Sequence, residues 1–402
     1  MTERRVPRIR FKGFEEDWEQ RKLGEIGTVM TCRRIFKNQT SESGEIPFYK
    51  IGTFGGVADA FITRDLFEEY RLKYPFPEKG DVLISASGSI GRTVEYTGEE
   101  AYFQDSNIVW FNHDESVIDT FLRNVYEVIK WSGVEGSTIK RLYNDNILRT
   151  GIKIPTISEQ EKIARFLDGF DMLLSLHQRK LEKLKILKKA MLEKMFPKKG
   201  AKVPEIRFSG FADDWEQRKL GEMAVISTGY PFNSNEFSPE GKYLVITNGN
   251  IQDSFTNVDE SVGNRITLLD RKILDSYILD IGDILITMDG TVGRTAKVAG
   301  NGLILAQRVG RVKPIGNTEF MYQALSTGDF SKAMTELSHG GTIKHISLNE
   351  ISLFEFKSPV REREQNTVGK FLYLFDSLLS LHQRKLEKLR QIKKSMLERM
   401  FV

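Results

Sequence analysis

Two copies of a glycine-rich loop carry side chains suited to contacting phosphates or base edges. The first copy reads GDVLIS and then GSIGRT (residues 80–93), and the second reads GDILIT and then GTVGRT (residues 282–295). Each pattern indicates an apolar strand that leads into a glycine loop. The hydroxyl, carboxylate and guanidinium groups on the loops are candidates for such contacts: Ser87, Ser89, Arg92, Asp289, Thr291 and Arg294.

The glycine loops do not have the composition of a nucleotide-binding P-loop. Ala86 and Met288 stand where such a loop requires its first glycine, and arginine replaces its lysine. Nucleotide hydrolysis is therefore excluded. Two interpretations remain open, a plain hairpin turn whose glycines supply positive φ and an exposed loop that touches nucleic acid.

A second pair of loops, GSTIKR (residues 136–141) and GGTIKH (residues 340–345), is small, polar and then basic. Other polar residues lie near the expected strand ends, and some of them have side chains able to make bidentate base contacts. Ordinary surface positions are the alternative for every one of these residues. The additional nucleic-acid candidates are Lys50, Thr53, Gln104, Asp105, Lys140, Arg141, Thr247, Asn248, Asn250, Gln307, Arg308, Lys344 and His345.

The sequence offers no constellation for catalysis or metal binding. Its one cysteine, Cys32, excludes an internal disulfide, and its five histidines form no cluster at metal-ligand spacing. No apolar run approaches the roughly 18 residues of a membrane span, and the N-terminus lacks the apolar core of a signal peptide. We expect a cytoplasmic protein without catalytic residues, metal or cofactor of its own.

The segments on either side of these loops show that the chain is a tandem duplication. PRIRFKGFEEDWEQRKLGEI (residues 7–26) returns as PEIRFSGFADDWEQRKLGEM (residues 204–223), and LSLHQRKLEKL (residues 174–184) returns unchanged at residues 379–389. A period near two hundred residues is far too long for a solenoid, whose repeats have roughly 20–50 residues. Each copy should therefore form a domain with its own core.

The middle of each copy has diverged and is rich in strand signals. Short apolar runs punctuated by Gly, Pro and Asn predict strands at residues 46–52, 81–87 and 107–112, and at 243–249, 283–289 and 303–312. Short helices are predicted at 121–130 and 320–325. The expected fold class is α+β, with two strand-rich mixed domains that are each followed by a long helix.

The two long helices have the apolar spacing of a coiled coil. A capping box of Ser158 and Glu161 predicts a helix from about Glu159 to Phe196, and its copy spans about Glu364 to Phe401. We expect the helices to pair as an antiparallel coiled coil; the alternative is that each helix packs only on its own domain. The residues expected to mediate pairing and partner binding are Phe170, Leu174, His177, Leu181, Leu184, Phe375, Leu379, His382, Leu386 and Leu389.

These patterns divide the chain into residues 1–158 and 200–360 as domains, and 159–199 and 361–402 as helical spacers. Nine Lys or Arg residues against two Glu lie in 177–199, and seven against two lie in 382–399. The formal net charge is only +4, so the remainder of the chain has a net charge of about −8. If the domains bind DNA, local basic patches or a partner must supply the phosphate contacts.

The combination of motifs resembles one known family. WEQRKLGE, a G-x-I-P-F-Y-K-I-G strand (residues 44–52), GDVLIS with its glycine loop, GSTIK and P-x-x-x-E-Q-x-x-I (residues 155–163) follow one another, with a duplication over the whole chain. This order resembles the DNA-specificity subunit of type I restriction-modification systems. The resemblance implies two target-recognition domains that each read one half of an asymmetric bipartite site, with the helices as spacer and as binding site for two methyltransferase subunits.

The resemblance also implies double-stranded DNA, two methyltransferase subunits and restriction subunits as partners. S-adenosylmethionine, and ATP with Mg for restriction, would belong to those partners, because this chain lacks an Asn-Pro-Pro-aromatic or Asp-Pro-Pro-Tyr element and a complete P-loop. The helices would set the half-site spacing at about one duplex turn, roughly 34 Å. Two other interpretations stay open, a protein-binding scaffold and the specificity subunit of a related single-complex restriction enzyme.

Overall fold

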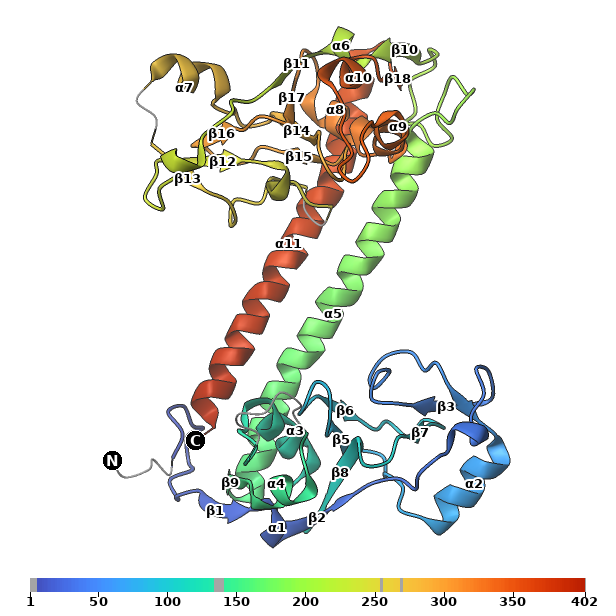
Figure 1. The fold of residues 1–402 in the computed structure, drawn as a ribbon, viewed down its shortest axis with the longest axis vertical. Helices are drawn as coiled ribbons and strands as arrows, with labels where there is room; N and C mark the ends of the chain where they lie inside the picture. Colours follow the sequence, from blue (N-terminus) through green and yellow to red (C-terminus); the bar gives the residue numbers. More distant parts are fainter. Residues whose placement is uncertain (1–5, 134–140, 254–255, 268–269, 402) are drawn as a thin grey trace. The chain divides into compact units, whose positions relative to one another are not determined.

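A computed structural model describes residues 6–133, 141–253, 256–267 and 270–401. The chain forms two compact units (Figure 1). The first comprises Met1–Leu176 and Glu387–Val402, and the second comprises His177–Leu386. Both boundaries fall within long helices, so each long helix contributes one part to each unit.

The first unit alternates short strands with short helices before its long helix begins. Its elements, in chain order, are β1 (Glu19–Lys22), α1 (Leu23–Ile26), β2 (Gly27–Met30), η1 (Lys37–Gln39), β3 (Ile46–Tyr49), β4 (Phe61–Ile62), α2 (Arg64–Lys73), β5 (Val82–Ser85), β6 (Thr93–Glu95), β7 (Tyr102–Phe103), β8 (Ile108–His113), α3 (Asp119–Val128), α4 (Asn144–Arg149), β9 (Gly151–Ile154) and α5 (Ile157–Met195).

The second unit repeats this order with few changes. Its elements are β10 (Glu216–Lys219), α6 (Leu220–Met223), β11 (Ala224–Thr228), η2 (Ser234–Glu236), β12 (Tyr243–Ile246), η3 (Asn248–Asn250), β13 (Arg265–Ile266), α7 (Arg271–Tyr277), β14 (Ile284–Thr287), β15 (Thr295–Lys297), β16 (Leu303–Leu305), β17 (Val309–Pro314), α8 (Thr318–Leu325), α9 (Asp329–Leu337), α10 (Leu348–Ser352), β18 (Glu355–Ser358) and α11 (Glu362–Met400).

The two units have the same sheet topology although their middles differ in sequence. Each contains a four-stranded antiparallel sheet, β2-β8-β5-β6 in the first and β11-β17-β14-β15 in the second. Each also contains a three-stranded sheet with one parallel pair, β4-β3-β7 and β13-β12-β16. The expected mixed α+β class is confirmed. The predicted strand at 303–312 is two strands, β16 and β17, because the chain turns at Arg308.

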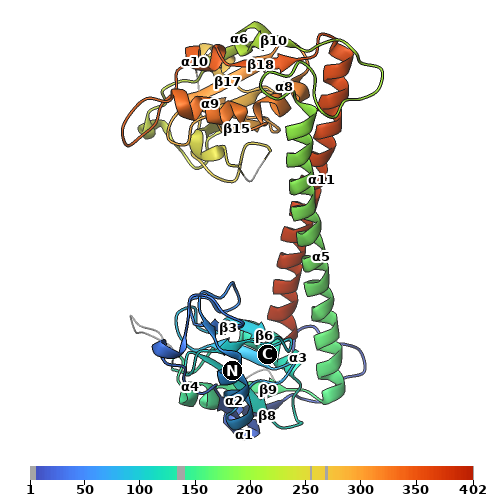
Figure 2. The same cartoon turned by 90° about the vertical axis from the view of Figure 1, so that its right-hand side faces the viewer.

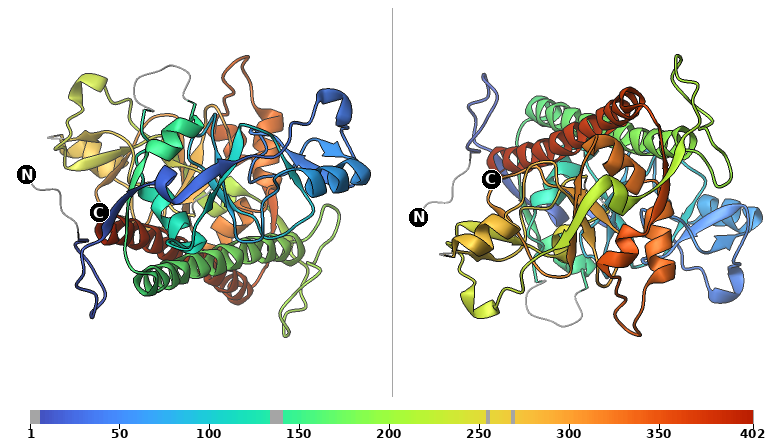
Figure 3. Two further views of the ribbon diagram at one scale, coloured as in Figure 1. Left: turned by 90° about the horizontal axis from the view of Figure 1, so that it is seen from below. Right: turned by 90° about the horizontal axis from the view of Figure 1, so that it is seen from above.

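A two-stranded ribbon that the apolar patterns did not predict completes each unit. β1 pairs antiparallel with β9, and β10 pairs with β18. The repeated EQRK sequence forms β1 and β10, whose side chains are mostly exposed. Figure 3 shows the strand and short helix that begin each unit lying across one face of that unit, dark blue in the left view and yellow-green in the right.

Apolar residues pack on both sides of the four-stranded sheets. In the first unit one core includes Leu23, Ile84 and Phe121, and a second lies between the two sheets around Phe48 and Tyr102. In the second unit the corresponding cores gather around Ile286 and around Leu285. Because successive residues of a strand point to opposite faces, β14 supplies both cores.

The long helices begin and end close to their predicted limits. Helix α5 begins at Ile157, so Ser158 lies within the first turn and is not the N-cap that its sequence predicted. The amides of Glu159 and Gln160 instead donate to the carbonyl of Thr156. No described helix is long and apolar enough to cross a membrane.

Within each unit α5 and α11 lie side by side (Figure 2), and side-chain contacts confirm that they pair. In the first unit Asp171 of α5 forms an ion pair with Lys393 of α11, at 2.7 Å. In the second unit Leu181 and Leu386 are buried, and His177 lies against His382. The other residues predicted to mediate pairing are half-buried: Phe170, Leu174, Leu184, Phe375, Leu379 and Leu389.

Candidate nucleic-acid interface

The sheet topology brings the candidate loops of each unit to one edge. In the second unit β12 and β16 run parallel, so the loops that follow them leave from the same end. Thr287, the last residue of β14, lies opposite Val309, the first residue of β17. The loops after β12, β14 and β16 therefore meet, and the loops after β3, β5 and β7 meet in the same way in the first unit.

The glycine loops form tight hairpins closed by a side-chain hydroxyl. Ser85 Oγ donates to the carbonyl of Ser89 at 2.5 Å and accepts from the amide of Arg92 at 2.9 Å. Thr287 Oγ1 makes the same two bonds in the second unit. The glycines at 88, 91, 290 and 293 have φ between +66° and +80°. These glycines therefore supply the positive φ of a hairpin turn, and Ser89 and Thr291 at the loop tips are exposed.

Hydrogen bonds join the three candidate loops of the first unit. Gln104 Oε1 accepts from the amide of Ile51 at 2.9 Å, and Arg92 Nη2 donates to the carbonyl of Gly55 at 3.2 Å. Gln104 thus holds the loop that contains Thr53. The Oε1 acceptor of its side-chain amide is therefore occupied, which reduces the capacity of Gln104 to hydrogen-bond a base.

Ser87, Asp105, Arg141 and Lys50 complete this surface. Ser87 Oγ donates to Asn107 Oδ1 at 2.9 Å, and Ser87 is bridged to Arg141. Lys50 forms an ion pair with Asp59, and Asp105 forms one with Arg34. The structure therefore groups every described candidate of the first unit. Lys140 lies outside the described residues.

The guanidinium of Arg141 lies beside Ser106. Its Nη2 donates to the carbonyl of Ser106 at 3.2 Å, and it also stacks over the ring of Tyr143. Sequence reasoning did not select Arg34, Ser106 or Asn107. Asn107 was available as a polar residue directly before a strand, whereas the importance of Ser106 depends on a backbone conformation that no sequence signal predicted.

In the second unit the candidates gather around Asp289. Its carboxylate accepts from His345 Nδ1 at 2.5 Å and from Arg308 Nη1 at 2.8 Å. The amide of Gly290 donates to the carbonyl of Lys344 at 2.9 Å. Partial burial opposes ionisation of Asp289, but its bonds to His345 and Arg308 outweigh this effect and lower its pKa.

The remaining candidates of the second unit frame this cluster. Asn248 Oδ1 accepts from the amide of Met288 at 3.3 Å, and Arg294 Nη2 forms an ion pair with Asp253 at 2.7 Å. Thr247 and Gln307 are exposed on the adjoining loops. The structure brings these residues to the same edge as Asp289.

The structure corrects the prediction that Asn250 contacts nucleic acid. It is only 1% exposed, and its side chain is occupied in holding the loop together. Its Oδ1 accepts from the amide and hydroxyl of Thr247, and its Nδ2 donates to the carbonyls of Asp259 and Val262. A buried amide with these bonds is a structural element, and we withdraw Asn250 from the candidate contacts.

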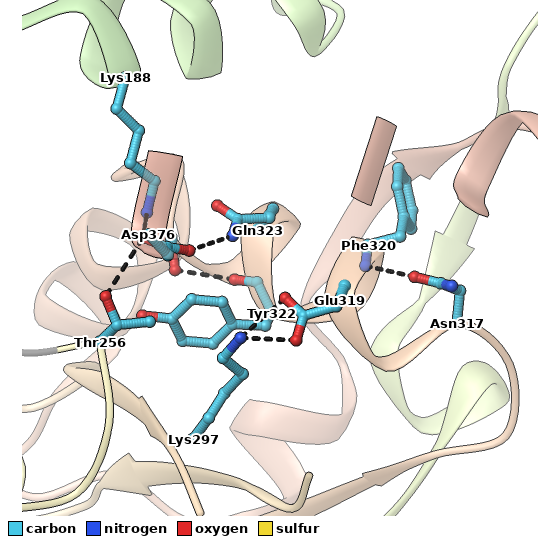
Figure 4. Close-up of polar contacts among 10 residues, drawn as sticks. Lys188, Thr256, Lys297, Asn317, Glu319, Phe320, Tyr322, Gln323 and Asp376 are labelled. Atoms are coloured by element: carbon cyan, nitrogen blue, oxygen red, sulfur yellow. Dashed lines mark hydrogen bonds and ion pairs between the residues drawn. The ribbon is translucent and has the colours of Figure 1, made fainter. Parts of the chain in front are cut away.

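A buried polar network attaches the second unit's domain to both helices (Figure 4). Asp376 of α11 is 4% exposed and accepts from Lys188 of α5 at 2.6 Å, from Gln323 of α8 at 2.6 Å and from Thr256 at 3.2 Å. Lys188 occupies an apolar position of the heptad pattern. Its ion pair explains why this position is charged.

The first unit contains the same helix-to-helix ion pair with the helices exchanged. Lys393 is the copy of Lys188, and Asp171 is the copy of Asp376. Lys393 also bonds to Glu127 of α3. Burial lowers the pKa of Lys393, but the bonds to the two carboxylates outweigh this effect and raise it.

The repeated ends of the two copies form equivalent buried ion pairs. Arg10 binds both carboxylate oxygens of Glu159 at 2.8 Å, and Arg207 binds those of Glu364 at 2.7 and 2.8 Å. Both glutamates are almost fully buried. The IRF motif that contains Arg10 or Arg207 is therefore joined to the EQ motif that contains Glu159 or Glu364 in each unit. Both motifs have a structural role.

Each unit also has a cleft lined by the same three basic positions of the repeat. In the second unit a cleft of about 710 Å³ is lined by Lys185, Lys188 and Lys189, and by the glycine-loop residue Arg294. In the first unit a cleft of about 690 Å³ is lined by their copies, Arg390, Lys393 and Lys394. In the described part of the chain, no group of three His, Cys, Asp or Glu residues could hold a metal ion.

Comparison with known proteins places these features in one family. Residues 15–186 and 212–391 match the model of the type I restriction modification DNA specificity domain. A putative type I restriction enzyme specificity subunit of Haemophilus influenzae is 56% identical over 152 residues, which are 38% of this chain and 40% of that protein. The putative type I restriction enzyme MjaX specificity subunit of Methanocaldococcus jannaschii is 25% identical over 95% of this chain and 92% of that protein.

The fold is also similar to that of a solved structure. The crystal structure of the S subunit of a type I restriction-modification system from M. genitalium aligns with a TM-score of 0.67. The identity is 16%, and the alignment covers 99% of both chains.

Proposed function

The chain belongs to the family of type I restriction-modification DNA specificity subunits, and on that premise we propose that each unit reads one half of an asymmetric bipartite DNA site. One observation carries this proposal. The two units present different side chains at equivalent loops on the same framework. Ser87 and Arg141 form an isolated antiparallel β-bridge in the first unit, and Asp289 and His345 form one in the second.

Two readers with one framework and different contact groups suit a site whose halves differ in sequence. Direct readout depends on the donors and acceptors that reach base edges. Exposed basic groups next to these loops, such as Lys344 and Arg141, supply phosphate contacts that position the domain without reading sequence. The low net charge of the chain makes these local groups, and the partner subunits, the sources of electrostatic affinity.

We further propose that catalysis resides in partner subunits. Two methyltransferase subunits would bind S-adenosylmethionine and methylate adenine, and restriction subunits would bind ATP and Mg. The repeated clefts support two equivalent attachment sites for methyltransferase subunits, because the same residue types line a cleft in each unit. A surface that is the same in both copies suits a partner that is present twice.

The test is to co-express the chain with its cognate methyltransferase and to map methylated adenines in host DNA by single-molecule sequencing. A two-part asymmetric motif with a fixed gap is the expected result. Unmodified DNA despite a stable complex would contradict the proposal. A matched culture expressing the methyltransferase without this chain controls for other methylation.

A further inference from the structure

Arg308 has an unusual backbone conformation at the candidate interface. Its φ is +68°, in the left-handed region, where long side chains are rarely found. Among the described residues outside glycine, only Ser106 shares this property, with φ +52° in the equivalent turn of the first unit. Such strained residues cluster at functional sites because the surrounding structure must hold them.

The side chain of Arg308 is held on one side and free on the other. Nη1 lies 2.8 Å from Asp289 Oδ2, and the arginine side chain is 62% exposed whereas that of Asp289 is 16% exposed. His345 Nδ1 contacts the other oxygen of Asp289 at 2.5 Å. The carboxylate is therefore anchored from both sides, and it orients a guanidinium that keeps unused donors toward solvent.

An oriented guanidinium is the side chain best suited to one base. Arginine donates two parallel hydrogen bonds to O6 and N7 of guanine in the major groove. Its planar fork loses less freedom on binding when a second group already holds it. The corresponding turn of the first unit contains Ser106 and Asn107, which offer no such fork.

We propose that Arg308 reads a guanine in the half-site bound by the second unit, with Asp289 as its positioning residue and His345 as the anchor of Asp289. This inference rests on the proposed DNA-recognition function and adds one base to it. It also predicts that the half-site bound by the first unit is read by different groups.

The experiment uses the purified complex of the full chain with its methyltransferase subunits, after the wild-type motif has been mapped. Each guanine of the two half-sites is replaced in turn by 7-deazaguanine, which lacks the N7 acceptor, and binding is measured at fixed salt. One guanine in one half-site should weaken wild-type binding about tenfold when replaced. In the Arg308→Ala complex, the same replacement should have no further effect.

Two further variants separate base reading from general loss of charge. Arg308→Lys keeps the charge but loses the fork, so it should discriminate against 7-deazaguanine less than wild type does. Lys344→Ala removes one charge from the neighbouring loop and should weaken binding to every site equally, with the sensitivity to 7-deazaguanine retained.

The outcomes distinguish this inference from the proposed function. If the wild-type complex recognises a bipartite motif but Arg308→Ala remains as sensitive as wild type to every 7-deazaguanine, the guanine assignment is wrong. It is also wrong if Arg308→Ala lowers affinity uniformly for all sites, since that result describes a phosphate contact. Absence of any motif in the wild type would instead refute the proposed function.

Discussion

His177 and His382 face each other across the helix pair, with their Nδ1 atoms 2.8 Å apart. One Nδ1 must donate and the other must accept, so the ring that accepts is neutral. Burial, the charge of His177 and the charges of Lys180 and Lys385 lower the pKa of His382. The two rings occupy an apolar position of each heptad pattern, where a polar pair specifies the register.

The histidine pair predicts weaker helix pairing in acid. Because the pKa of His382 is lower in the folded chain than the ordinary histidine value of 6.5, the unfolded chain binds more protons as pH falls. The stabilisation is present above pH 6.5 and is lost as pH falls through the lowered pKa. We expect the thermal midpoint to decrease more between pH 7.5 and 5.5 in the wild type than in the His177→Gln/His382→Gln variant. Equal pH slopes would contradict this expectation.

The buried Asp376 predicts a large loss of stability when its charge is removed. Asp376→Asn leaves Lys188, whose side chain is 13% exposed, without its ion-pair partner. Breaking a buried pair from one side costs about 3 kcal/mol, measured here as a decrease in the urea midpoint. Glu182→Gln is the control, since it breaks the exposed pair with Lys185 and should change stability by less than about 1 kcal/mol. Similar effects from both variants would show that Asp376 has no special role.

The loop glycines predict unequal effects of alanine. Gly290 and Gly293 both have left-handed φ, which alanine adopts at a cost of about 1–2 kcal/mol. Only at Gly293 would the new Cβ lie 2.9 Å from Ser331 Cα and 3.0 Å from Met334 Cβ. Gly293→Ala should therefore destabilise the chain by roughly 1–3 kcal/mol more than Gly290→Ala, as measured by urea unfolding. Equal stability of the two variants would contradict the close packing of this loop against Ser331 and Met334.

The helix pair predicts the gap between half-sites. Seven residues inserted after His177 in α5, together with seven inserted before His382 in α11, preserve the heptad register and the facing histidines. The pair lengthens by about 10 Å at 1.5 Å per residue, which corresponds to about three base pairs. Methylome mapping should show both half-sites unchanged and the gap longer by about three. An unchanged gap would exclude the helices as the spacer.

The repeated clefts predict the number of bound methyltransferase subunits. Charge reversal of Arg390 and Lys394 should remove one subunit, and reversal of Lys185 and Lys189 should remove the other, as read by native mass spectrometry. Each pair lines the cleft of its own unit. Full occupancy with weakened DNA binding in both variants would instead assign the clefts to the DNA backbone.

The sequence alone predicted the features that depend on local pattern. Repetition of LSLHQRKLEKL established the duplication, and heptad spacing predicted two long helices. In the structure each end of these helices lies within two residues of its predicted position. Glycines beside an apolar strand indicated a strand that leads into a tight loop. These features are readable because periodicity and backbone preference act over a few neighbouring residues.

Only the tertiary structure decided which distant residues meet. EQRK is polar and lacks an apolar pattern, yet it forms β1 and β10 because a partner strand well over a hundred residues away completes its hydrogen bonds. The same long-range packing buried Asn250 and joined Arg308 to Asp289 and His345. Such contacts depend on sheet register and strand order, which short-range sequence patterns do not specify.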